Sequence, residues 1–80
     1  MIDSSTQRPV RVLGDITYGS IIEVAVSQLD LVRKLLSDND IPHWVENNFF
    51  WFDDRPPVAF INVRKGTDPL RVQALLDAIE

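Results

Sequence analysis

The chain has 80 residues, of which 45% are hydrophobic and 25% charged, a balance that indicates one soluble globular domain rather than a disordered or membrane-embedded chain. Twelve acidic and eight basic residues leave a net charge of −4, and the basic residues are scattered, which argues against nucleic-acid binding through phosphate contacts. The absence of cysteine excludes disulfides, a thiolate nucleophile and cysteine-ligated zinc.

Residues 1–9 are mostly polar and lack the basic segment and apolar run of a secretory signal, so we expect a cytoplasmic protein. No stretch approaches the roughly 18 consecutive apolar residues that would span a bilayer. We predict a flexible leader over residues 1–9, because little in it can offset the entropy of ordering it, and a single α+β domain over residues 10–80.

Two segments alternate with the period of two that is typical of β-strands. In Ser20–Val26, one face carries Ile22, Val24 and Val26 and the other carries Ile21, Glu23 and Ala25. In Val58–Lys65, one face carries Ala59, Ile61 and Val63 and the other carries Val58, Phe60, Asn62 and Arg64. Upstream, Val10–Leu13 is also β-prone, and the glycines that follow it can fold it back beside Ser20–Val26 as an extra edge strand.

Two helices are predicted from capping residues and a period of 3.6. The first opens at Ser27, with Asp30 completing a capping box, and ends near Ser37–Asn39, where asparagine tolerates a left-handed backbone. Its apolar stripe is Leu29, Val32, Leu35 and Leu36. The second has Asp68 as its cap and Pro69 in its first turn, and its stripe is Val72, Leu75, Leu76 and Ile79.

Between the helices lies an extended aromatic segment, His43–Asp53. Four of the seven aromatic residues of the chain fall in Phe49–Phe52, and a fifth is Trp44. The turn-forming run Asp53–Pro57 leads into the next strand, which predicts an antiparallel hairpin. A tight turn at Asn47-Asn48 that splits the aromatic segment in two is the alternative.

The order β-α-β-β-α, with a short N-terminal strand possible before it, predicts an α+β two-layer sandwich. Its sheet is antiparallel or mixed, and both helices pack on one face. The aromatic segment is apolar on both of its faces, so one set of side chains packs under the helices and the other faces away from them, beside Ile21, Val58 and Phe60.

This second face can be covered in two alternative ways. The N-terminal residues can fold over it within one chain, these being Val10, Val12, Leu13, Ile16 and Tyr18. Alternatively, a protein partner or a second copy of the chain covers it, because a domain this small has a thin core and gains from burying an exposed apolar face. The residues that we expect to carry such an interaction are Ile21, Trp44, Phe50, Phe52 and Phe60.

No catalytic, cofactor-binding or metal-binding residue is predicted. His43, the only histidine, has only Asp40 as a carboxylate close in sequence, so we interpret it as a residue at the rim of a strand. Asp38–Asp40 starts like a calcium loop but lacks the later glycine and glutamate. Arg64–Thr67 precedes a helix N-terminus that Asp68 already caps, which makes it a weak anion site.

The stretches Leu35–Pro42 and Ile61–Pro69 resemble the corresponding motifs of a family of small bacterial domains known as prokaryotic signal-transducing proteins, or DUF2007. The resemblance covers about residues 20–80, and Asp40 stands where the family usually has glycine. It implies a ferredoxin-like or PII-like α+β module without established catalysis.

We therefore expect a non-enzymatic regulatory or protein-interaction module that acts through the aromatic sheet face, as a homo- or hetero-oligomer. The alternative is a ligand-sensing regulatory domain that binds a small-molecule effector at a subunit interface, near the end of the first long strand and the start of the first helix. These hypotheses involve neither nucleic acid nor a membrane.

Overall fold

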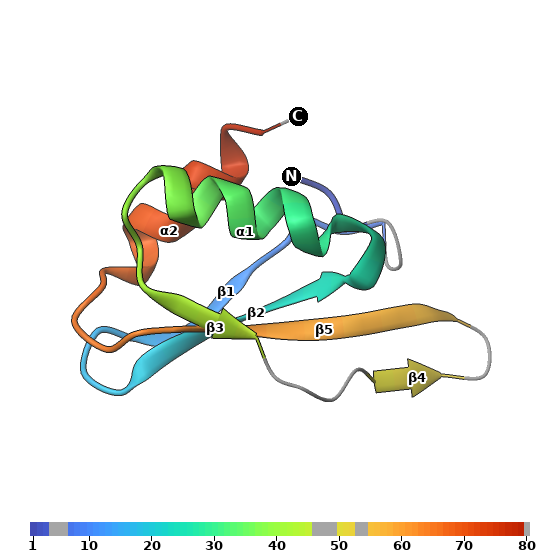
Figure 1. The fold of residues 1–80 in the computed structure, drawn as a ribbon, viewed down its shortest axis with the longest axis horizontal. Helices are drawn as coiled ribbons and strands as arrows, with labels where there is room; N and C mark the ends of the chain where they lie inside the picture. The colour runs from blue at the N-terminus through green and yellow to red at the C-terminus, as the bar shows by residue number, and fades with distance from the viewer. Residues whose placement is uncertain (4–6, 46–49, 53–54, 80) are drawn as a thin grey trace.

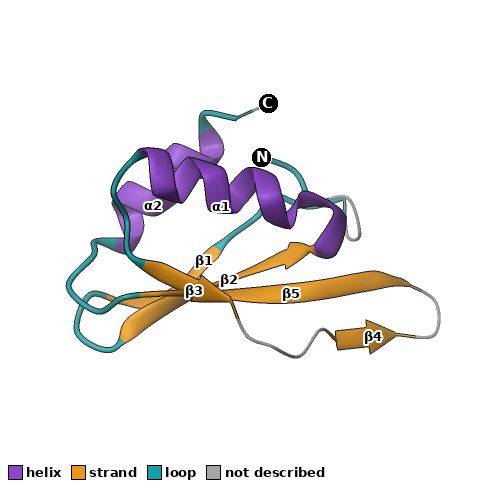
Figure 2. Cartoon of the chain, in the orientation of Figure 1, coloured by secondary structure: helices purple, strands orange, loops and turns teal. Residues whose placement is uncertain are grey.

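The computed structural model describes residues 1–3, 7–45, 50–52 and 55–79, with side chains placed for all of these except 50–52, 55 and 56. Figure 1 shows a single sheet with both helices on one side of it. In chain order the elements are β1 (Val12–Asp15), β2 (Gly19–Ala25), a 3₁₀ turn (Val26–Gln28), α1 (Leu29–Asp38), β3 (His43–Val45), β4 (Phe50–Phe52), β5 (Arg55–Val63) and α2 (Pro69–Asp77). The α+β two-layer architecture predicted from the sequence is confirmed (Figure 2).

The sheet has the order β1-β2-β5-β3, and β4 also pairs with β5. Every described pairing is antiparallel. The predicted short N-terminal strand is therefore present at one edge, beside β2. Because β2 and β3 are both antiparallel to β5, they run parallel to each other with β5 between them, and α1 makes the crossover that connects them.

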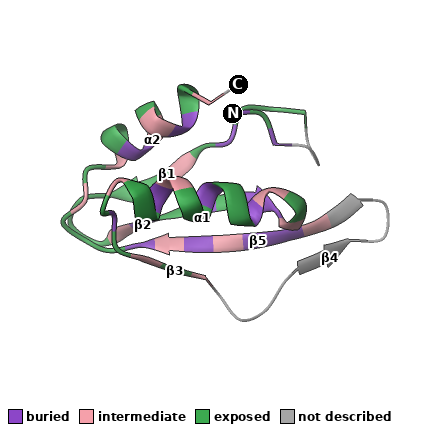
Figure 3. Ribbon diagram, turned by 45° about the horizontal axis from the view of Figure 1, so that its top comes forward, coloured by how far each residue is buried: buried purple, intermediate pink, exposed green. Residues whose placement is uncertain are grey.

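The core lies between the helices and the inner face of the two central strands. The alternation predicted for these strands is confirmed, since Ile22, Val24, Ala59 and Ile61 are fully buried while Ile21 is exposed. Figure 3 shows buried and intermediate residues alternating along β5. The helices contribute side chains that are buried or nearly so, these being Leu29, Val32 and Leu36 from α1 and Val72 and Leu76 from α2. At about 1.5–3 kcal/mol per buried aliphatic side chain, this cluster is the main stabilising contribution to the fold.

The start of α2 agrees with the prediction, and the caps at both ends of α1 differ from it. Asp68 caps α2 as expected, with its Oδ1 accepting a hydrogen bond from the Leu70 backbone N–H at 2.9 Å. The cap at the start of α1 is instead Gln28, which makes no side-chain capping bond, so the predicted capping box at Ser27 is wrong. The reason is that the chain forms a 3₁₀ turn over Val26–Gln28 before the α-helix begins.

The left-handed residue after α1 is Asp40, with φ of 55°, and not Asn39. The N–H groups of Asp40 and Ile41 donate to the carbonyls of Ser37 and Leu36, at 3.1 and 2.9 Å. This is the Schellman pattern, in which the residue after the C-cap usually is glycine. Asn39 closes the helix in another way, by donating from its side-chain Nδ2 to the Leu35 carbonyl at 2.8 Å.

The hairpin predicted over the aromatic segment is interrupted. Val45 pairs with Ile61 and Phe50 pairs with Val58, so the register of β4 on β5 is shifted from that of β3. Both β3 and β4 run antiparallel to β5, and the chain keeps its direction from one to the other, which supports a single irregular hairpin. Asn47 and Asn48, proposed as an alternative turn, lie outside the described residues.

The described part of the segment 1–9, predicted as a flexible leader, packs against the domain. Met1 is buried, its terminal nitrogen donates to the Leu76 carbonyl at 2.9 Å, and Ile2 forms a bridge with Pro9. The Val10 N–H donates to the Met1 carbonyl at 2.9 Å. The contact with Leu76 joins the segment to the far end of the chain, and together these contacts offset the entropy of ordering it.

One side chain of α2 closes the outer edge of the sheet. The Gln73 amide accepts a hydrogen bond from the Val12 N–H through Oε1 and donates through Nε2 to the Val10 carbonyl, both at 2.9 Å. It thereby takes the place of a further strand along this edge, where unpaired backbone groups would otherwise invite pairing with another chain. Nε2 also donates to Asp77 Oδ1 at 3.0 Å.

We expect Gln73→Leu to lower the free energy of unfolding by about 1–3 kcal/mol, because two backbone groups at the edge lose their partners while the apolar volume is kept. Urea unfolding followed by circular dichroism measures this. Asp77→Ala is the control, since it removes only the exposed third bond and should cost at most about 0.5 kcal/mol. Equal losses in the two variants would contradict the role given to Gln73.

We expect Asp40→Gly to raise the free energy of unfolding by about 0.5–1 kcal/mol, because glycine adopts a positive φ without the steric cost of a Cβ. The matched variant is Asp38→Gly, two residues earlier and inside α1, where the same substitution should destabilise the protein. Thermal unfolding measures the stability of both variants. A change in stability of the same sign in both would refute the role given to the positive φ of Asp40.

Candidate functional site

The side of the sheet that faces away from both helices is called the open face below. Leu13 pairs with Ile21, Ile21 with Asn62, and Asn62 with Trp44, so these residues form one row across four strands. Side chains directly opposite each other in an antiparallel sheet have Cβ atoms about 4.5–5.5 Å apart, so the row is continuous. Leu13 is 61% exposed, Ile21 41% and Trp44 55%.

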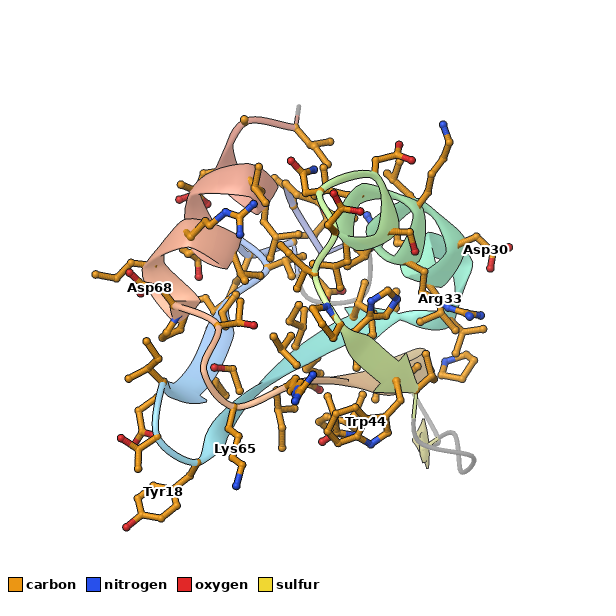
Figure 4. All side chains as sticks on the ribbon, turned by 60° about the vertical axis from the view of Figure 1, so that its left-hand side comes forward. Tyr18, Asp30, Arg33, Trp44, Lys65 and Asp68 are labelled. Atoms are coloured by element: carbon orange, nitrogen blue, oxygen red, sulfur yellow. The ribbon has the colours of Figure 1, made fainter. Side chains whose placement is uncertain are left out.

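Two further rows lie on the same side of the sheet along β2 and β5, and only the nearer of them is accessible. Glu23 pairs with Phe60, whose side chain is half-buried, and Ala25 pairs with Val58, both of which are buried. Figure 4 shows Trp44 and Lys65 on the side of the sheet away from the helices. The row of Leu13, Ile21, Asn62 and Trp44 contains no charged side chain, and the charge of Glu23 lies one row away from it.

The structure places three of the five predicted interaction residues on this face, namely Ile21, Trp44 and Phe60. Phe50 and Phe52 belong to β4, opposite Val58 and Arg55 of β5, but their side chains are outside the described part of the structure. Leu13 was not predicted as an interaction residue. The signal for it was present, because the alternation of Val12 and Leu13 places one of them on each face once β1 pairs with β2.

The N-terminal residues proposed as an internal cover do not take that place. Leu13, Ile16 and Tyr18 are exposed, and Figure 4 shows Tyr18 pointing away from the sheet beyond its end. Val10 and Val12 pack with the core cluster on the helix side. The reason is that this segment pairs with β2 as an edge strand, which extends the open face sideways and leaves it uncovered by these residues.

A cavity of about 310 Å³ lies at the β1 edge of the open face. Its lining residues come from the N-terminal segment, β1 and β2, and are Asp3, Arg8, Pro9, Val10, Arg11, Leu13 and Glu23. Leu13 belongs both to this cavity and to the apolar row. The volume is at the small end of the range for ligand pockets in proteins.

The other candidates show ordinary structural contacts. The half-buried His43 has its Nδ1 2.8 Å from the Ile41 carbonyl, and because a carbonyl only accepts, Nδ1 carries the proton. The carboxylate of Asp68 occupies the N-terminus of α2, as expected. Among the described residues, no group of three or more histidine, aspartate or glutamate side chains could hold a metal ion.

No protein-family model matches this chain, and no curated protein and no solved structure is significantly similar to it. The resemblance to the prokaryotic signal-transducing family therefore stays a prediction. Within the described residues, no helix is long and apolar enough to cross a membrane.

The strand register predicts a large loss of stability from substituting one isoleucine of β2 and a small loss from substituting its neighbour. Ile22 is fully buried and Ile21 is 41% exposed. We expect Ile22→Ala to lower the free energy of unfolding by about 2–5 kcal/mol, because it leaves a cavity in the core, and Ile21→Ala to lower it by less than about 1 kcal/mol. Chemical denaturation at low protein concentration tests this. Similar losses at the two positions would show that the faces of β2 are assigned wrongly.

Proposed function

We propose that this protein is a non-enzymatic regulatory or protein-interaction module that acts through the open face of its sheet. The observation that carries this proposal is the uncharged row Leu13, Ile21, Asn62 and Trp44 across four strands, of which the three apolar side chains are exposed. Single exposed apolar residues are common on protein surfaces, but a contiguous group is typical of an interaction site. Tryptophan in particular contributes much of the binding free energy in protein interfaces.

The occupant that the face fits best is a second copy of the chain. In a face-to-face dimer with its two-fold axis parallel to the strands and between β2 and β5, Leu13 of one copy lies opposite Trp44 of the other. Glu23 then lies opposite Phe60 of the other copy and not opposite a second Glu23. In a symmetric dimer the same surface of both copies forms the interface, so like charges must not face each other there. The pairing of Glu23 with Phe60 of the other copy meets this requirement.

The area of the face is consistent with a reversible dimer. Four strand positions at about 4.8 Å give a width of about 19 Å, and the nine residues of β5 give a length of about 30 Å. The projected area is at most about 600 Å², below the roughly 800 Å² per partner of a standard interface. We therefore infer a dimer that exchanges with monomer at micromolar concentration.

The fold class also favours a regulatory or protein-interaction role. We assign the arrangement of β2, α1, β3 and β5 to a ferredoxin-like or PII-like class, in which two parallel strands joined by a helix enclose a third, antiparallel strand. β1 supplies the fourth strand position from the N-terminal side. Within this proposal the chain is a bacterial, cytoplasmic relative of the DUF2007 signal-transducing domains, as the motifs Leu35–Pro42 and Ile61–Pro69 suggest.

Two leucines provide a matched test of the dimer. Leu13 on the open face is 61% exposed and Leu70 on α2 is 77% exposed. We expect Leu13→Glu to raise the dimer dissociation constant at least about 100-fold, because a carboxylate would be buried against Trp44 of the other copy, and Leu70→Glu to leave it unchanged. Sedimentation equilibrium over a concentration series measures both constants.

Wild-type protein that stays monomeric at millimolar concentration would overturn the homodimer. Equal weakening by Leu13→Glu and Leu70→Glu would overturn the assignment of the open face as the interface. Circular dichroism establishes that both variants remain folded, as expected for exposed positions.

The cavity at the β1 edge favours a second candidate function, the sensing of a small ligand. It lies against the open face rather than at the start of α1, where the sequence had led us to expect a ligand. The chemistry of the cavity decides which ligand it can take.

A further inference from the structure

The cavity at the β1 edge has walls that are held by backbone hydrogen bonds. The Asp3 N–H donates to the Arg8 carbonyl and the Gln7 N–H to the Asp3 carbonyl, both at 2.8 Å. On the inner side, the Gln73 amide fixes the backbone at Val10 and Val12. These bonds hold the described lining residues near one another in the free protein, so the ligand does not have to bring them together.

The cavity brings together two oppositely charged residues that make no direct contact with each other. Arg11 and Glu23 both line it, and both residues are exposed. Neither forms an ion pair or a hydrogen bond with any described residue, and they are not within 4 Å of each other. Asp3 and Arg8, which also line the cavity, are already engaged in other contacts. Arg11 and Glu23 thus remain available to a ligand.

We propose that the cavity binds a small zwitterion, namely a free α-amino acid with an aliphatic side chain. The ligand carboxylate pairs with the Arg11 guanidinium, whose planar donors match a carboxylate in two parallel hydrogen bonds. The ligand ammonium group pairs with the Glu23 carboxylate. An α-amino acid carries both charges on one carbon, which suits two opposite groups lining a cavity of about 310 Å³.

The other lining residues determine which ligand side chain the cavity favours. Pro9 and Leu13 supply the exposed apolar part of the lining, so an aliphatic side chain gains from leaving water there. Glycine lacks this contribution and should bind more weakly than leucine or valine. Every residue that this inference uses belongs to one chain, and two of them, Leu13 and Glu23, also lie on the face that the proposed dimer covers.

The experiment is an NMR titration of the full ¹⁵N-labelled chain with L-leucine. We expect the amide signals of residues 10–13 and of Glu23 to shift with saturation. Leucinamide, which lacks the carboxylate, and N-acetyl-leucine, which lacks the ammonium group, should each bind at least about tenfold more weakly, because each loses one charge-assisted pair.

Arg11→Gln and Glu23→Gln should each weaken leucine binding at least about tenfold. Arg33→Gln and Asp30→Asn are the matched controls, because they make the same charge changes at exposed positions of α1 that do not line the cavity, and should leave binding unchanged. Figure 4 shows both side chains on α1.

Absence of saturable shifts with leucine, valine and glycine at high millimolar concentration would overturn the proposal. Equal binding of leucine and of its two single-charge analogues would overturn the recognition of both charges. The analogue series uses wild-type protein, so it remains decisive even if a variant at Arg11 or Glu23 does not fold.

Discussion

The pairing of β2 with β5 is the constraint on which the rest of the structure depends. Six residue pairs hold these strands in one register at the centre of the sheet. That register places Ile22 opposite Ile61 under the helices and Ile21 opposite Asn62 on the other side. A slip of one residue would move every side chain of β2 to the wrong face. The core and the open face are therefore two consequences of one pairing.

The faces of the central strands and the start of α2 could be predicted from the sequence, because the sequence patterns that indicate them are local. Alternation identifies the faces of β2 and β5, and Asp68 with Pro69 identifies the start of α2. The contacts that could not be predicted join distant parts of the chain. Gln73 reads as an ordinary exposed helix residue, and nothing local indicates that its amide bonds the backbone more than 60 residues earlier.

The same distinction between local patterns and long-range contacts explains why Leu13 and the cavity were not predicted as parts of the candidate site. The aromatic composition drew attention to the segment around Trp44, and that residue does lie exposed on the open face. Leu13 and the cavity depend on where the N-terminal segment docks. Its polar composition predicts mobility, while its docking rests on the burial of Met1 and on backbone hydrogen bonds that composition does not reveal.

The cavity and the apolar row share Leu13, and Glu23 lines the cavity one row away on the same strand as Ile21. A ligand that contacts Leu13 changes the surface that a second copy would cover, and a second copy restricts access to the cavity from the open face. Linkage then requires the effect to be reciprocal, so that a ligand that weakens the dimer by a given factor binds the dimer more weakly by that factor. Such coupling would make the edge strand β1, and not the aromatic segment alone, the element through which a small molecule controls assembly.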